Sequence, residues 1–199
     1  VFDTAWLART KGIKNVLNSN VYIIEKPLRK LCTVLDAANI DLKSFNDEIY
    51  KKITAGSMEP VLKSLLVFKE EGVWLEITNL VIPSWTDDME TIKKMCEWLV
   101  KNGLSEVPLH FSRFTPMYKL TQLPLTPVST LEKAYDIARS AGVKYVYIGN
   151  VPAHRAESTY CHNCGSLLIE RRGFTIIKNE MKNGLCGKCK VKVPGVWKN

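Results

Sequence analysis

Apolar positions in the first 150 residues alternate between the helical period and a period of two. The helical period predicts helices over 2–11, 27–35, 46–53, 58–71, 87–102 and 130–141. The period of two predicts strands over 14–20, 37–43, 72–82, 107–114 and 144–149. Strands that alternate with helices are typical of parallel strands covered by helices, so the sequence predicts an α/β fold.

Polar residues within these strands gather on one face. In the second strand Asn39, Asp41 and Lys43 alternate with the apolar Ile40 and Leu42. The strand over 107–114 shows the same alternation. A polar face toward the strand ends suits a barrel with a ligand at its mouth, whereas an open doubly wound sheet has more uniformly apolar strands. The pattern favours a barrel.

The number of strands is smaller than a closed barrel needs. No strand precedes the helix over 2–11, which begins almost at Val1. We therefore expect an incomplete barrel, with at least one further strand–helix unit before Val1.

Two cysteine pairs with the same two-residue gap mark the C-terminal region: Cys161/Cys164 and Cys186/Cys189. This gap lets a tight turn direct both sulfurs at one metal, and two such pairs complete a tetrahedral site. The apolar runs 167–169 and 174–177 flank Gly173 and predict a β-hairpin between the pairs. We expect a barrel domain over 1–150 and a zinc-ribbon-like domain over 151–199. Four thiolates leave no open metal position, so the site is expected to be structural, with zinc as the metal.

The remaining cysteines and His162 call for simpler interpretations. Cys32 and Cys96 stand alone in predicted helices and are expected to be small buried apolar residues. His162 lies inside the first cysteine pair, where it is awkwardly placed as a ligand, and we expect it to be exposed.

Composition narrows the classes of partner. The formal net charge of +8 indicates either a generally basic surface or attraction to an anionic partner. Metal-bound thiolates would offset about two charges of the tail, so we expect no nucleic-acid partner. No run of 18 apolar residues exists, so no membrane span is expected. The cysteine pairs, together with the absence of a basic-then-apolar leader, favour a reducing cytoplasm.

Candidate ligand-binding residues fall at the predicted strand ends. Asp41 and Lys43 can either contact a ligand or form a structural ion pair. His110 on the fourth strand can serve a ligand or stay a hydrogen-bonded core residue. Asn18 and Asn20 can bond ligand hydroxyls or turn the chain.

Several motifs resemble the radical S-adenosylmethionine enzymes related to pyruvate formate-lyase activating enzyme: residues 14–20, Asn39-Ile-Asp-Leu-Lys43, Leu80-Val-Ile-Pro83 with Asp87-Asp88, and His110-Phe-Ser-Arg-Phe-Thr-Pro116. The segments Tyr145–Pro152 and Pro194–Trp197, with the two cysteine pairs, resemble the radical enzyme of the AmmeMemoRadiSam system.

The resemblance implies a partial (βα)6 barrel, of TIM-barrel type, that holds a 4Fe–4S cluster and S-adenosylmethionine. It implies reductive cleavage of that cofactor to a 5′-deoxyadenosyl radical, which abstracts hydrogen from a protein or small-molecule partner. It places Ser19 and Asn20 near the cofactor, Asp41 and Lys43 on its methionine and ribose groups, and His110 near cofactor and substrate.

Two departures from the family pattern stand out. Val21 occupies the place of the family's glycine, so this turn is expected to differ if it requires a positive φ. The cluster-binding CxxxCxxC is absent from this sequence, and so is the glycine-rich motif that follows it. We expect both before Val1, and we expect the chain alone, as a C-terminal fragment, to be inactive.

Two alternatives to a radical enzyme remain at this stage. One is a non-enzymatic zinc-binding module that acts through its basic tail. The other is an ordinary TIM-type enzyme that uses Asp41, Lys43 and His110 without a cluster.

Overall fold

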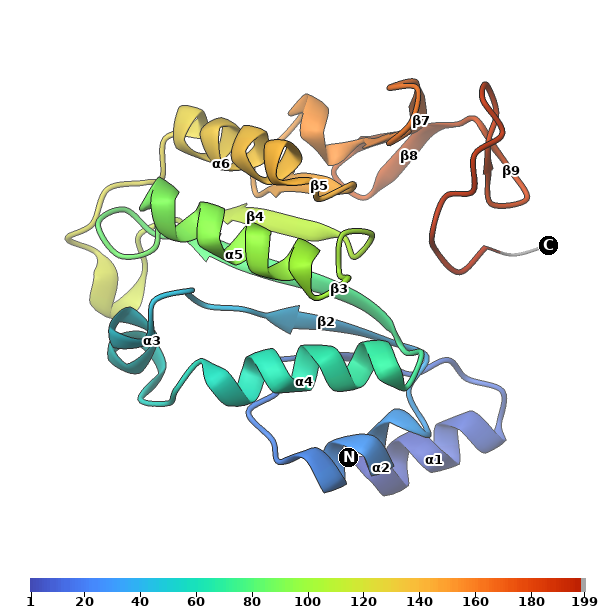
Figure 1. Ribbon diagram of the computed structural model, residues 1–199, viewed down its shortest axis with the longest axis horizontal. Coiled ribbons are helices and arrows are strands. Elements are labelled where there is room, and N and C mark those ends of the chain that lie inside the picture. Colours follow the sequence, from blue (N-terminus) through green and yellow to red (C-terminus); the bar gives the residue numbers. More distant parts are fainter. Residues whose placement is uncertain (198–199) are drawn as a thin grey trace. The chain divides into compact units, whose positions relative to one another are not determined.

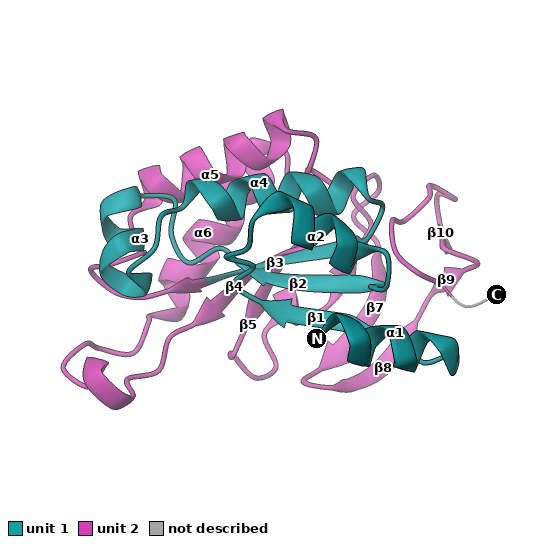
Figure 2. Cartoon of the chain, turned by 90° about the horizontal axis from the view of Figure 1, so that it is seen from below, with its two compact units in different colours: residues 1–79 teal, residues 80–199 magenta. Residues whose placement is uncertain are grey.

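The computed structural model describes residues 1–197, and they divide into two compact units, one over 1–79 and one from residue 80 onward (Figure 2). The first unit is drawn in teal and the second in magenta. The expected domains, 1–150 and 151–199, are defined by sequence pattern, whereas these units are defined by contacts in the structure. The expected boundary at 150 therefore stays a prediction.

The first unit consists of three parallel strands and four helices (Figure 1). Its strands are β1 (Val16–Ser19), β2 (Ala37–Asp41) and β3 (Trp74–Val81), the last of which ends in the second unit. Its helices are α1 (Phe2–Thr10), α2 (Glu25–Cys32), α3 (Asp47–Thr54) and α4 (Glu59–Glu70). Leu28 of α2 and Phe68 of α4 are fully buried, so these neighbouring helices supply much of the apolar core.

Strand register aligns the polar positions of the first unit. Asn39 of β2 stands opposite Asn18 of β1 on one side and Glu76 of β3 on the other. Ile40 and Ile77, one position further on, are fully buried. One face of these strands is therefore polar and the other apolar, as the alternation predicts.

The first part of the second unit adds two further parallel strands, β4 (Leu109–Arg113) and β5 (Val146–Gly149). Helices α5 (Met89–Lys101) and α6 (Val128–Ala141) lie side by side, and the 3-10 turn η1 is Tyr118–Leu120. Asp88 begins α5 by accepting the backbone N–H of Thr91 at 2.8 Å, and Gly142 ends α6 with a φ of 103°. Both helix ends agree with the sequence pattern.

The tail of the second unit consists of short antiparallel strands. After the 3-10 turn η2 (Arg155–Glu157), the strands are β6 (Thr159–Tyr160), β7 (Leu167–Arg172), β8 (Thr175–Asn179), β9 (Met181–Lys182) and β10 (Leu185–Cys186). Gly173 turns the predicted hairpin between β7 and β8. Asn183 and Gly184 both have positive φ values, 52° and 74°, as a two-residue hairpin turn requires. Leu168, Ile169 and Val193 form the tail's apolar core.

The expected α/β class and the predicted hairpin are confirmed. The observed strands are shorter than predicted because pairing stops before the apolar pattern does. β6 and η2 lie between β5 and the first cysteine pair, and β6 forms because β7 provides a strand edge to pair with.

Candidate functional site

The four cysteines of the tail converge on one point. Their sulfur atoms all lie within 4.8 Å of one another. Two of these separations are 3.6 Å, for Cys161 and Cys189, and 3.8 Å, for Cys164 and Cys186. A tetrahedral metal with bonds of about 2.3 Å to sulfur places its ligands about 3.8 Å apart. The sulfur positions therefore fit one tetrahedral metal ion, and the predicted four-cysteine cluster is confirmed.

Each cysteine pair forms a knuckle with the same main-chain hydrogen bonds. In the first, Cys161 N donates to Ser166 O at 2.9 Å and Gly165 N donates to Cys161 O at 3.0 Å. In the second, Cys186 N donates to Val191 O at 2.9 Å and Lys190 N donates to Cys186 O at 3.0 Å. The bonds fall at identical positions, so the two-residue gap defines the same turn twice.

The surroundings of the sulfurs differ. Burial raises the pKa of Cys161 to about 11. The Ser166 hydroxyl, followed by the backbone N–H of Cys189, lowers the pKa of Cys186 to about 5. Ser166 Oγ lies 3.1 Å from Cys164 Sγ and 3.5 Å from Cys186 Sγ, so one hydroxyl serves both knuckles. Sequence reasoning missed Ser166, although its place directly after a knuckle glycine marks it.

The expectation that His162 is exposed is wrong. Its ring is half-buried, and its Nδ1 lies 2.8 Å from the hydroxyl of Tyr145. Burial lowers the pKa of His162. The Tyr145 phenol, directly before β5, is the partner of the imidazole, and His162 is outside the metal-ligating group, as predicted.

The predicted ligand residues of the first unit begin at the turn after β1. Ser19 Oγ accepts the N–H of Val21 at 3.0 Å, and Asn20 Oδ1 accepts the N–H of Tyr22 at 3.3 Å. Val21 is buried and has a φ of 47°, a conformation that β-branched residues rarely adopt. The turn therefore takes the left-handed conformation without a glycine. Asn20 is exposed.

Asp41 and Lys43 form a half-exposed ion pair at the end of β2. The Lys43 ammonium lies 2.7 Å from Asp41 Oδ2, and both side chains are 31% exposed. Tyr50 of α3 lies nearby, and burial, then the Asp41 charge, raises its pKa to about 12. Thr78, the register partner of Asp41 on β3, donates its hydroxyl to Asn39 Oδ1, two residues before Asp41, at 2.9 Å. The pair is reachable from solvent and rests on a polar layer.

His110 belongs to the second unit and stacks on Tyr147. The two rings stand opposite each other in the β4–β5 register, with centroids 4.9 Å apart and an angle of 16° between their planes. Arg171 of β7 approaches Tyr147 from the tail, 6.0 Å from its ring centre. Sequence reasoning missed Tyr147, whose position on the polar face of β5 is the signal that could have found it.

Within the described part of the chain no helix is both long and apolar enough to cross a membrane.

The sequence matches the Radical SAM superfamily over residues 3–107, which is more than half of the chain. The chain therefore belongs to the Radical SAM superfamily.

Proteins of similar sequence show which members of the superfamily this chain resembles. A Methanocaldococcus jannaschii protein described only as uncharacterized is 44% identical over 195 residues, which cover 97% of this chain and 58% of that protein. The pyruvate formate-lyase 1-activating enzyme of Escherichia coli K12 is 24% identical over 151 residues, which cover 70% of this chain and 61% of that enzyme. This chain thus spans about three fifths of the length of these two relatives. The expected relation to pyruvate formate-lyase activating enzymes is confirmed as homology.

Solved structures share the fold. A domain of a pyruvate-formate lyase-activating enzyme from Bacteroides vulgatus matches with a TM-score of 0.63 and 16% identity, over 75% of this chain and 89% of that chain. Streptococcus suis SuiB bound to S-adenosylmethionine matches with a TM-score of 0.60 and 11% identity, over 80% of this chain and 39% of that chain. These likenesses support the radical SAM fold.

Proposed function

We propose that this chain is the part of a radical SAM enzyme, of the AmmeMemoRadiSam kind, that holds S-adenosylmethionine at the ends of β1 and β2. A 4Fe–4S cluster and S-adenosylmethionine together supply a 5′-deoxyadenosyl radical, which takes hydrogen from a protein or small-molecule partner. The carrying observation is the superfamily match over 3–107, which includes the half-exposed Asp41–Lys43 pair.

The chemistry of this pair suits the proposed ligand. A carboxylate accepts hydrogen bonds from ribose hydroxyls, and an ammonium donates to the carboxylate of the methionine part. Because Asp41 and Lys43 form an ion pair, each charge is compensated before a ligand binds. Asn20 supplies an exposed amide at the neighbouring strand end. His110, held by Tyr147, is proposed to lie near cofactor and substrate.

Substitution of the ion pair tests this proposal in the protein expressed from its whole coding region. We expect Asp41→Asn and Lys43→Met each to raise the KM for S-adenosylmethionine about tenfold or more, since hydrogen bonds to charged groups contribute about 1.5–3 kcal/mol. The assay measures 5′-deoxyadenosine formation after anaerobic cluster reconstitution.

Lys51→Met is the matched control, because Lys51 also pairs with an aspartate but lies on the exposed surface of α3. An unchanged KM in both ion-pair variants, with the control also unchanged, would show that S-adenosylmethionine does not bind at this strand end.

We further propose zinc as the metal of the four-cysteine site, in a reducing compartment that keeps the thiols free. Thiolates around a tetrahedral site favour zinc or iron, and zinc needs no redox role. Elemental analysis of the purified 199-residue chain is expected to give one zinc per chain. Cys32→Ala, a lone buried cysteine, should keep the metal. Iron in stoichiometric amount, with charge-transfer absorption in the visible range, would contradict zinc.

A further inference from the structure

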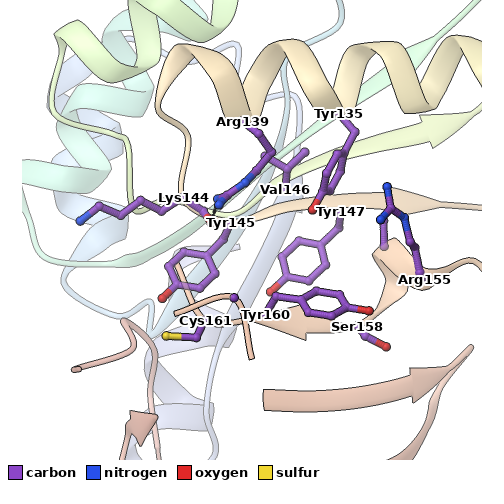
Figure 3. A pocket seen from close by; sticks show the side chains of 12 residues that line it. Tyr135, Arg139, Lys144, Tyr145, Val146, Tyr147, Arg155, Ser158, Tyr160 and Cys161 are labelled. Atoms are coloured by element: carbon purple, nitrogen blue, oxygen red, sulfur yellow. Dashed lines mark hydrogen bonds between the residues drawn. The ribbon is translucent and has the colours of Figure 1, made fainter. Parts of the chain in front are cut away.

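A cavity of about 330 Å³ lies beside the first cysteine knuckle, within the second unit (Figure 3). Its walls come from α6, from β5 and from the segment that runs through η2 and β6 to Cys161. The consecutive residues Tyr145, Val146 and Tyr147 all line it. Since neighbouring strand residues point to opposite faces, the cavity must run along the edge of β5.

This edge is open among the described residues, because β5 is paired with β4 on one side only. An open edge carries main-chain N–H and C=O groups that no strand satisfies. Proteins commonly cover such an edge with a strand or loop. Here the η2–β6 segment stands off from it and leaves a cavity of the size that small ligands occupy.

The walls of the cavity are positively charged. They include Arg139, Lys144 and Arg155, and no carboxylate is among the described lining residues. Lys144 pairs with Glu106, and the Arg139 guanidinium donates to the carbonyl of Val143 at 3.0 Å. Apart from the metal-bound thiolate of Cys161, the charged side chains that line the cavity are all cationic, and the exposed Arg155 among them is placed to meet an anion.

Tyrosines form the rest of the walls. Figure 3 shows the rings of Tyr135, Tyr147 and Tyr160 pointing into the same space, with the Arg155 guanidinium beside them. Tyr147 is fixed by its stack on His110 and by the 2.9 Å contact between its hydroxyl and Thr159 Oγ1. Tyr145 is fixed by His162. Rigid aromatic walls favour a flat ring, which can stack on them at little entropic cost.

We propose that this cavity binds a small organic anion that carries a flat unsaturated ring, with its charge toward Arg155 and its ring among the tyrosines. The site is distinct from the strand ends proposed for S-adenosylmethionine, and the proposal does not depend on that function.

Three probes separate the contribution of the ring to binding from the contribution of the charge. Phenyl phosphate carries both ring and charge, inorganic phosphate carries only charge, and phenol carries only the ring. Isothermal titration of the metal-loaded 199-residue chain should show phenyl phosphate binding at least tenfold tighter than either partial probe. Its affinity should also fall as salt concentration rises.

Arg155→Gln is expected to weaken phenyl phosphate binding about tenfold. Arg155 is exposed at the cavity, so the change removes charge without disturbing the core. Arg172→Gln is the matched control: it removes an exposed tail cation that does not line the cavity, and binding should not change.

Three results would overturn the proposal: phenyl phosphate no tighter than inorganic phosphate, equal losses in Arg155→Gln and Arg172→Gln, or no binding at millimolar concentration. The first would leave only a general attraction of anions to a basic surface. A failure to bind S-adenosylmethionine would change none of these results, so the two proposals are tested independently.

Discussion

The two cysteine knuckles share their main-chain hydrogen bonds and differ in the position of their glycine. After the second cysteine, the first knuckle has Gly165 with a φ of 69°, and the second has Lys190 with a φ of 62°. After the first cysteine, the first knuckle has His162, which reaches Tyr145, and the second has Gly187. Each knuckle thus uses one glycine, at a different place.

The difference shows that the two glycines are required for different structural reasons. Gly165 has open space around its missing Cβ, so only its backbone conformation favours glycine. Gly187 has an ordinary conformation, but a Cβ there would overlap the carbonyl oxygen of Glu180. One glycine relieves backbone strain and the other allows close packing, while the two-residue gap alone sets the turn.

The largest effect is expected from the sulfurs themselves. Cys161→Ser and Cys186→Ser should each lower metal affinity more than about 100-fold, since four thiolates together contribute about 10–16 kcal/mol. Amide exchange should then accelerate in β6–β10 and stay slow in α5 and α6. Equal losses in the two variants would support equivalent knuckles, and full metal retention in either one would contradict that equivalence.

The close approach at Gly187 should give the next largest effect. Gly187→Ala forces the Glu180 carbonyl to move, and overpacking of this kind costs about 1–3 kcal/mol. Because the tail folds around its metal, the cost should appear as an affinity about tenfold weaker in a chelator competition. His162→Ala, at the same position of the first knuckle, should lower the metal affinity less, since it removes one half-buried hydrogen bond and creates no overlap.

The backbone strain at the left-handed positions should be smaller again. Gly165→Ala places a side chain at positive φ without any clash, at a cost of about 1 kcal/mol, or about fivefold in metal affinity. Lys190→Ala keeps a side chain at the equivalent position and should leave the affinity nearly unchanged. If both variants behave alike, the conformational difference between the knuckles has no energetic meaning.

The smallest effect should be a gain. Lys190→Gly removes a left-handed side chain, but glycine also loses more chain entropy on folding, so roughly twofold tighter metal binding is expected. The same competition measurement detects it. Weaker binding would mean that the 2.8 Å bond from Lys190 Nζ to Gly187 O outweighs the strain.

Features set by local spacing could be predicted from the sequence. The cysteine gaps predict the knuckles, Asn183-Gly184 predicts its hairpin turn, and the alternation around Asp41 predicts a pair with Lys43, because each depends on neighbours along the chain.

Features that depend on register between strands could not be predicted in this way. The stack of His110 on Tyr147 requires that β4 and β5 align at that position. The bond between Tyr145 and His162 joins residues 17 apart. The left-handed Val21 lies in a turn whose neighbours impose a conformation that valine itself disfavours.

The ring of Tyr147 is in contact with two parts of the molecule at once. It lies flat against His110, and the Arg171 guanidinium of the tail hairpin lies over it. Ring currents from Tyr147 shift the resonances of the imidazole, so the NMR signal of His110 should report whether the tail is folded. A shortened version that stops after β5 would therefore change the environment of His110 and should not be treated as a neutral deletion.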